Sequence, residues 1–318
     1  MSAETPPGAW GGDPERKPQI VEQVRAAAYG RDEVAAGAVL HLRHQDGRRT
    51  SGQIFAVAFD TADAAEIEVR SGLPAVVLRL IGGVLAACEH WSAGRDGKTG
   101  DLYVAPAAID GAARMLEAIP VGADLAVLPQ RYLVALLTQL SVDSGDDTWL
   151  AGSGTRDLLR SVLALHAGDR RDKAGFRALR RDVVRATDAA ESIPDRVVLT
   201  MLESVAWPID DLTEELPGIV QTLHLNLRNA LGSAQPTVDE RRVIADFEEA
   251  MRVLQEEFAA DPAIDPVQFN ERVRASPSFR AFRNAMFQAR LVGYTRVACD
   301  EYAPNALALL QRVLRNGE

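Results

Sequence analysis

An acidic cluster follows Pro208, where Asp210, Asp211 and Glu214 are close neighbours in the sequence. On a helix these three carboxylates come within reach of one cation, and carboxylate oxygens are ligands that Mg²⁺ prefers. The acidic first turn of a helix explains the same residues, because the helix macrodipole favours negative charge there. We prefer the helix-start explanation and keep a Mg²⁺ site as the alternative.

The same cluster resembles the aspartate-rich, diphosphate-binding motif of helical isoprenoid enzymes. That resemblance implies a Mg²⁺-dependent, all-helical enzyme, which also needs a second metal-binding helix that the sequence does not contain. The glycine-rich stretch 151–155 lacks the features of a nucleophile elbow or a phosphate loop. The five histidines are scattered, and Cys88 and Cys299 have no partner at metal-ligand spacing. We therefore expect no cofactor and favour a non-enzymatic protein.

Charge is segregated along the chain, which has 35 basic and 45 acidic side chains and a net charge of −10. Residues 151–187 carry 9 basic and 4 acidic side chains, and residues 266–299 carry 6 basic and 1 acidic. Between these basic segments, residues 188–265 carry 17 acidic and 5 basic side chains. The basic segments need an explanation in a protein that is acidic as a whole.

The arginines of the two basic segments recur at helical spacing. Arg177, Arg181 and Arg185 are four residues apart and are expected to line one face of a helix. Arg283 and Arg290 are seven apart, with Arg280 beside them, and predict a second such face. Two explanations need no partner: the arginine faces are solvated, or they pair with the acidic segment of the same chain. Two explanations involve a partner: the faces bind an acidic protein surface, including that of a second copy, or they bind nucleic acid. Few aromatic residues accompany these arginines, so a platform for stacking bases is not predicted. The negative net charge slightly favours a protein partner over nucleic acid.

Three short segments resemble the coat proteins of rod-shaped plant viruses: 216–223, 237–243 and 268–270. In that family, paired arginines near the start of a long helix face the RNA. The resemblance implies this role for Arg241 and Arg242. It leaves the N-terminal half unmatched, and we do not infer membership of that family.

Hydrophobic periodicity predicts a mainly α-helical chain with a small α+β region before the helices. We expect a helix over 19–29, strands at 39–43, 53–59 and 66–70, and a buried helix over 75–91. Further helices are expected at 106–117, 129–140, 155–167, 175–191, 194–206, 210–231 and 304–314, with a helix start at Ser276–Pro277. Pro217 should interrupt the helix over 210–231. The clearest helix begins with a capping box at Thr237 and Glu240 and buries a stripe that includes Phe247 and Phe258.

The predicted organisation is a disordered lead over 1–18, an α+β region over 19–105 and a helical bundle over 106–318, with a hinge between Asp143 and Thr155. The lead lacks the features of a secretory signal, and no apolar run reaches the length of a membrane span. We expect a cytoplasmic interaction or assembly protein that binds itself, another protein or, as the alternative, nucleic acid, and no membrane. The Mg²⁺-dependent helical enzyme remains the second functional hypothesis.

Overall fold

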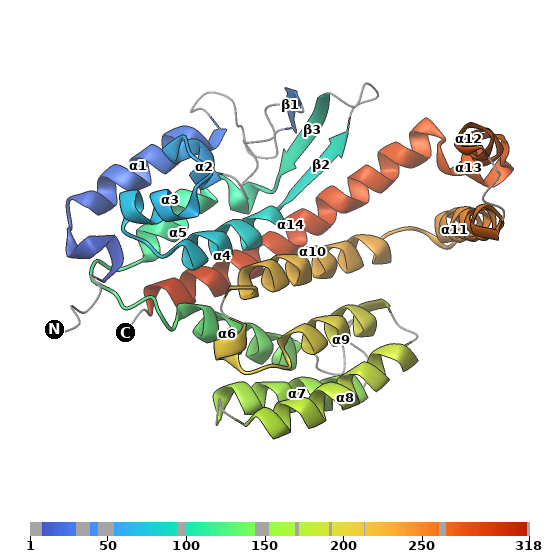
Figure 1. Cartoon of the computed structure of the whole chain (residues 1–318). Helices are drawn as coiled ribbons and strands as arrows, with labels where there is room; N and C mark the ends of the chain where they lie inside the picture. The colour runs from blue at the N-terminus through green and yellow to red at the C-terminus, as the bar shows by residue number, and fades with distance from the viewer. Residues whose placement is uncertain are drawn as a thin grey trace. The chain divides into compact units, whose positions relative to one another are not determined.

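The structure is a computed structural model, and it describes residues 8–29, 39–43, 54–93, 99–143, 153–168, 172–190, 193–212, 214–260 and 265–316 (Figure 1). The chain is mainly α-helical, as predicted, and its described strands form one small sheet in the N-terminal region. It divides into two compact units: unit 1 consists of residues 1–230 and 299–318, and unit 2 of residues 231–298. Residues 144–152 of the predicted hinge lie outside the described residues.

The described strands all belong to the N-terminal part of unit 1, where helices alternate with a three-stranded antiparallel sheet of order β1-β3-β2. Val39 lies opposite Tyr103, and Glu89 lies opposite Val104. The elements are η1 (Ala9–Gly12), α1 (Arg16–Tyr29), β1 (Val39–Arg43), α2 (Ile54–Phe59), α3 (Ala64–Ser71), α4 (Ala75–Ala86), β2 (Glu89–Ala93) and β3 (Thr99–Val104).

Two segments that we predicted as strands are helices, α2 and α3. Asp63 caps α3 by accepting a hydrogen bond from the Ala65 amide at 2.9 Å, and Gly72 ends it with a left-handed φ of 72°. These local signals outweigh the alternating pattern of residues 66–70. The predicted strand β1 is confirmed, and it pairs with β3, a strand that we did not predict.

The prediction of a disordered lead is wrong for residues 8–18. The Trp10 side chain is fully buried, its indole Nε1 donates to the Ile119 carbonyl at 3.3 Å, and its amide donates to the Gly72 carbonyl at 2.9 Å. Burial of one tryptophan removes about 200 Å² from water, which stabilises a segment that its glycines and prolines disfavour. Residues 1–7 lie outside the described part of the chain.

Helices make up the rest of unit 1 and nearly all of unit 2. They are η4 (Pro106–Ala108), α5 (Gly111–Ala118), α6 (Leu128–Asp143), α7 (Ser153–Ala167), α8 (Lys173–Ala189), α9 (Ile193–Val205), η5 (Ile209–Asp211), α10 (Leu216–Ala234), α11 (Val238–Ala260), α12 (Pro266–Ala275), α13 (Pro277–Phe282) and α14 (Ala285–Arg315). Pro217 lies in the first turn of α10, so the helix predicted over 210–231 begins only at Leu216. The separate helix predicted over 304–314 is part of α14, which continues through Pro304.

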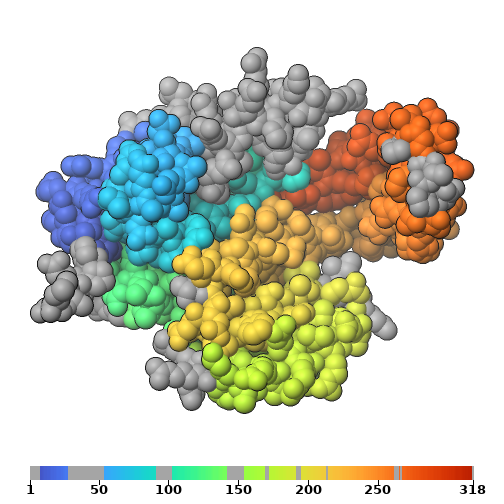
Figure 2. Space-filling model, viewed as in Figure 1, coloured from blue at the N-terminus to red at the C-terminus, as the bar shows by residue number. Residues whose placement is uncertain are grey.

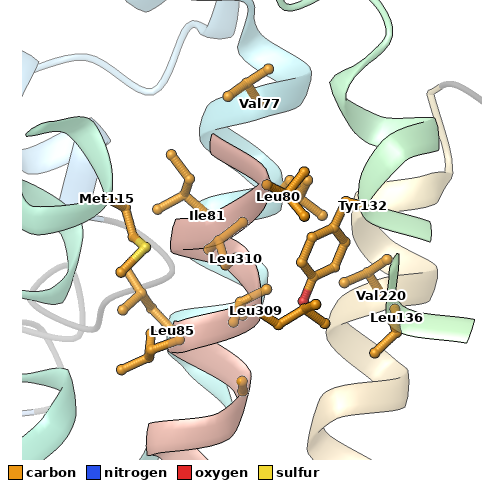
Figure 3. Packing of buried hydrophobic residues seen from close by; sticks show 14 of the residues in the cluster. Val77, Leu80, Ile81, Leu85, Met115, Tyr132, Leu136, Val220, Leu309 and Leu310 are labelled. Carbon is orange, nitrogen blue, oxygen red and sulfur yellow. The ribbon is translucent and has the colours of Figure 1, made fainter. Parts of the chain in front are cut away.

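The core of unit 1 forms around α4, whose side chains are apolar on nearly all sides. Figure 3 shows Leu80 and Ile81 of α4 beside Leu310 of α14, with Met115 of α5 on one side and Tyr132 of α6 on the other. Each such aliphatic side chain contributes about 1.5–3 kcal/mol when it is fully buried. The helix that we predicted over 75–91 therefore exists, but it ends at Ala86 where the chain turns into β2.

Helices α7, α8 and α9 pack on one another within unit 1 (Figure 1). The carboxylate of Asp172 caps α8 by accepting a hydrogen bond from the Gly175 amide at 2.8 Å. The inner face of α8 buries Phe176, Leu179 and Val183. Its other face lies at the molecular surface (Figure 2, yellow-green).

In unit 2, helix α11 begins with the capping box that the sequence predicted. The Thr237 amide donates to a Glu240 carboxylate oxygen at 2.9 Å, and the Glu240 amide donates to the Thr237 hydroxyl at 3.3 Å. The stripe behind it is only half-buried, in contrast to the predicted core. The Phe247 ring stacks on Phe282 with centroids 4.1 Å apart. The helix start predicted at Pro277 is confirmed. The sequence also predicts that Met286 faces inward, but its side chain is 73 % exposed.

Within the described residues, no single helix is long and apolar enough to cross a membrane. Helices α3 and α4 meet the length and composition criteria only as a pair, and the chain bends by 103° between them.

Candidate functional site

Helix α8 presents the predicted row of arginines on its outer face. Arg177, Arg181 and Arg185 are all exposed and follow one another at intervals of four residues. At 3.6 residues per turn, this row lies opposite the buried face of the helix. We call these three residues the arginine ridge.

Two of the three ridge arginines have no carboxylate within ion-pair distance in the described chain. Arg177 Nε donates to the Lys173 carbonyl at 3.2 Å, and Arg181 makes no ion pair with a described residue. Arg185 Nε donates to the Arg181 carbonyl at 3.3 Å, and its Nη2 pairs with Asp182 at 2.9 Å. The ridge therefore exposes more positive charge than its own helix compensates.

An arginine beside the ridge stacks on an exposed tryptophan. The Arg180 guanidinium carbon lies 4.1 Å from the centroid of the Trp207 ring, and Trp207 is 37 % exposed. Such a cation–π contact contributes about 0.5–1 kcal/mol at an exposed site. Sequence analysis did not identify this pair, because Arg180 and Trp207 lie in different segments and meet only through the packing of α8 against α9.

The arginines of unit 2 do not form the second continuous face that the sequence predicted. Helix α13 ends at Phe282, and Arg283 lies in the turn before α14. The Asn284 side chain caps the new helix by accepting hydrogen bonds from the amides of Met286 and Phe287 at 3.0 and 3.2 Å. Arg283 and Arg290 therefore belong to different segments.

One unit 2 arginine is neutralised inside the unit. Arg290 forms an ion pair with Glu240, which is only 8 % exposed and also accepts a hydrogen bond from the Tyr294 hydroxyl at 2.8 Å. Hydrogen bonds from the Thr237 amide, from Tyr294 and from Arg290 lower the pKa of Glu240 to about 2.

The remaining unit 2 candidates are exposed, and none makes an ion pair with a carboxylate among the described residues. Arg241 Nη1 donates to the Pro236 carbonyl at 2.6 Å. The others are Arg242, Arg280 and Arg283.

The acidic cluster after Pro208 does not gather around one point. Asp211 lies 3.7 Å from the Lys173 ammonium, while Glu214 pairs with Arg79 at 2.8 Å, and Asp210 is exposed in the short helix η5. In the described part of the chain, no three His, Cys, Asp or Glu side chains are placed to hold a metal ion. The geometry thus gives the Mg²⁺ hypothesis no support.

A chain of buried polar side chains in unit 1 was not predicted as a group. The Tyr132 hydroxyl lies 2.7 Å from His224 Nε2, and His224 Nδ1 contacts the Tyr302 hydroxyl. Burial lowers the pKa of His224 to about 3, so the ring is neutral. His224 lies in the apolar stripe of α10, which is a sequence signal of burial but gives no information about its partners.

Both cysteines are free, buried thiols in the same unit. Burial raises the pKa of Cys88, and it raises the pKa of Cys299 to about 11. Arg228 Nη1 lies 4.0 Å from Cys299 Sγ. The thiols are protonated at neutral pH, which makes them poor nucleophiles.

A cavity of about 600 Å³ lies in unit 1 between α4, α9 and α10. The Arg79–Glu214 ion pair lies at its wall, and Thr200, Gln221 and Asn226 supply further polar groups. The described residues around it include no histidine or cysteine, and of its two carboxylates, Glu214 and Glu215, the first is paired with Arg79.

No protein-family model, curated protein or solved structure matches the chain. The functional interpretation therefore rests on the geometry of the two units.

Proposed function

We propose that this chain is a non-enzymatic interaction protein that binds an acidic surface of another protein through the arginine ridge of α8. The observation that supports the proposal is the position of Arg177, Arg181 and Arg185, exposed and directly opposite the buried face of their helix. A planar guanidinium binds carboxylates through two parallel hydrogen bonds. Arg177 and Arg181 are free of carboxylate partners among the described residues and are available for such contacts.

One feature favours a protein partner over nucleic acid. In the Arg180–Trp207 stack, half-buried Arg180 lies against exposed Trp207, and both residue types are enriched in the energetic centres of protein interfaces. As part of the same proposal we assign the protein to the cytoplasm, where free thiols such as Cys88 and Cys299 persist.

The test is fluorescence anisotropy of two labelled probes, a poly-glutamate peptide and a uridine oligonucleotide of similar charge. We expect the intact chain to bind the peptide at low salt and to lose most of that binding at high salt, because exposed charges are screened within about 8 Å at physiological ionic strength. The variant Arg177→Gln/Arg181→Gln should bind the peptide at least about tenfold more weakly, which corresponds to about 1.4 kcal/mol.

The matched control is Arg312→Gln/Arg315→Gln, which removes the same charge from exposed positions near the end of α14. This control should keep the affinity of the intact chain. If both double variants lost the same peptide affinity, the net charge of the chain, and not the ridge, would cause the binding. Preference for the oligonucleotide over the peptide would overturn the assignment of a protein partner.

A further inference from the structure

Helix α11 carries an apolar seam with the spacing of a coiled coil. Ile244, Phe247, Met251, Leu254 and Phe258 follow one another at alternating intervals of three and four residues, as the a and d positions of a heptad do. None of these five side chains is fully buried within unit 2. A seam of this kind in a packed hairpin or bundle is normally covered from both sides.

Among the described residues, α13 contacts the seam through the stack of Phe282 on Phe247, and α12 covers one flank of it. On that side the Phe258 ring contacts Phe269 of α12 at a centroid distance of 4.9 Å, and Glu257 pairs with Arg272 at 3.4 Å. Glu257 occupies a g position of the heptad, so α12 lies along the g flank of α11. On the e flank all three residues are exposed. They are Arg241, Glu248 and Gln255.

Unit 2 also has a small interior for its size. Its described residues include only four buried apolar side chains. They are Pro236, Val273, Phe287 and Ala298. Small helical units need either more buried apolar area than this or an association that supplies it.

We propose that a second copy of the chain covers the N-terminal part of the open flank, around Arg241 and Glu248, with α11 of each copy packed antiparallel against the other about a two-fold axis. The charges of the flank select a second copy as the occupant. In an antiparallel pair the e flanks face each other, and an axis near Ile244 brings Arg241 of each copy opposite Glu248 of the other copy. The same flank of α11 thus carries both the arginine and the glutamate, and the two copies form two identical ion pairs.

The same two residues do not reach each other within one chain. They are seven positions apart on α11, about 10 Å along the helix axis. The Arg241 guanidinium hydrogen-bonds to the Pro236 carbonyl, on the side away from Glu248. An ion pair between Arg241 and Glu248 therefore requires two copies.

The test is sedimentation velocity of the full chain over a range of protein concentrations, combined with charge reversal. We expect a species of twice the 34.4 kDa chain mass. Arg241→Glu and Glu248→Arg should each raise the dimer dissociation constant by about tenfold or more, because each places like charges opposite one another twice. The double variant Arg241→Glu/Glu248→Arg should restore the dissociation constant to within about threefold, or about 0.7 kcal/mol, of the original.

The matched control uses Arg242 and Glu249, which have the same residue types and the same spacing but lie on the outer face of α11. Their reversals, Arg242→Glu and Glu249→Arg, should leave the dissociation constant unchanged. Circular dichroism of every variant checks that the helices remain folded.

Three results would overturn the proposal. One is a chain that stays monomeric up to about 100 µM, a concentration at which even a weak dimer is detected. Another is a dimer that tolerates both single reversals, which would place the interface elsewhere. The third is a double variant whose dimer dissociation constant stays as high as those of the single variants. The pairing does not depend on the arginine ridge of α8, and the poly-glutamate affinity should be the same in all of these variants.

Discussion

The Tyr132 hydroxyl and His224 Nε2 lie 2.7 Å apart in the interior of unit 1, and the other ring nitrogen of His224 contacts the Tyr302 hydroxyl. These residues belong to α6, α10 and α14, so one imidazole joins three helices. A neutral imidazole has one donor and one acceptor nitrogen, which means that one tyrosine donates to the ring and the other accepts from it. Both ring nitrogens are therefore satisfied, and the polar chain fixes how the three helices align along one another.

Tyr132→Phe should destabilise unit 1 by about 1–3 kcal/mol, because it leaves a buried imidazole nitrogen without its hydrogen bond. Urea unfolding followed by circular dichroism measures the loss. The control is Tyr103→Phe, which removes a hydroxyl that donates to Asp300 at 2.7 Å. Because Asp300 is exposed, water can replace the lost hydrogen bond. The control variant should therefore lose less stability than Tyr132→Phe. Equal losses would contradict the role that we assign to the buried chain.

Stability should fall as the pH is lowered from about 6.5 toward 3. Burial lowers the pKa of His224 from its ordinary value of 6.5 to about 3, so the unfolded chain binds a proton that the folded chain excludes. The stabilisation is complete above the unfolded pKa and decreases by about 1.4 kcal/mol per pH unit below it. Burial also lowers the pKa of His166, which adds to the slope in the same direction.

The histidine contribution can be separated from that of Glu240. The pKa of Glu240 is lowered from 4.5 to about 2, so its stabilisation is complete above 4.5 and is lost only below it. Urea midpoints measured between pH 4.5 and 6.5 therefore report the histidines. The variant His224→Gln should flatten the slope in this range. An unchanged slope would show that His224 is not the neutral, buried group described above.

Local signals predicted most helices, because each is encoded within a few residues. The capping box at Thr237 and Glu240 and the proline at the start of α13 are confirmed in this way. The strand predictions for 53–59 and 66–70 were wrong because short apolar runs fit both a strand and a helix. Tertiary packing selects between the two. The buried Trp10 was missed for a related reason, since its partners Gly72 and Ile119 are distant in sequence.

The candidate surface was predictable only where it lies on one helix. The four-residue spacing of the ridge correctly placed Arg177, Arg181 and Arg185 on one face of α8. The spacing of Arg283 and Arg290 was misleading, because the Asn284 cap restarts the helix between them. The pairing of Arg290 with Glu240 joins residues fifty positions apart, and periodicity carries no information about such contacts.

Removal of the α11 cap should loosen unit 2 locally. Thr237→Ala deletes the hydroxyl that accepts a hydrogen bond from the Glu240 amide, at an expected cost of about 1 kcal/mol. Hydrogen exchange measures this loss as faster exchange of the α11 amides, with little change in α4. The control Thr237→Ser keeps the hydroxyl and should exchange like the original chain. Uniform acceleration in both helices would mean that the two units unfold as one.

Two glycines on facing helices should respond oppositely to alanine. A Cβ at Gly83 of α4 would lie 3.1 Å from the Gln221 Cβ and 3.3 Å from the Pro217 carbonyl oxygen, both on α10. Alanine gains up to about 1 kcal/mol over glycine in a helix interior, but here the helices must separate to admit the methyl group. We therefore expect Gly83→Ala to lower the urea midpoint.

Gly218→Ala, in the first turn of α10, is the matched comparison. A Cβ there meets no atom within 4 Å, and the residue already has helical geometry. Its substitution should leave the urea midpoint unchanged or raise it, because the unfolded chain loses conformational freedom while the folded chain gains no clash. If Gly83→Ala were as stabilising as Gly218→Ala, then α4 and α10 would not be in the close contact that positions Arg79 beside Glu214.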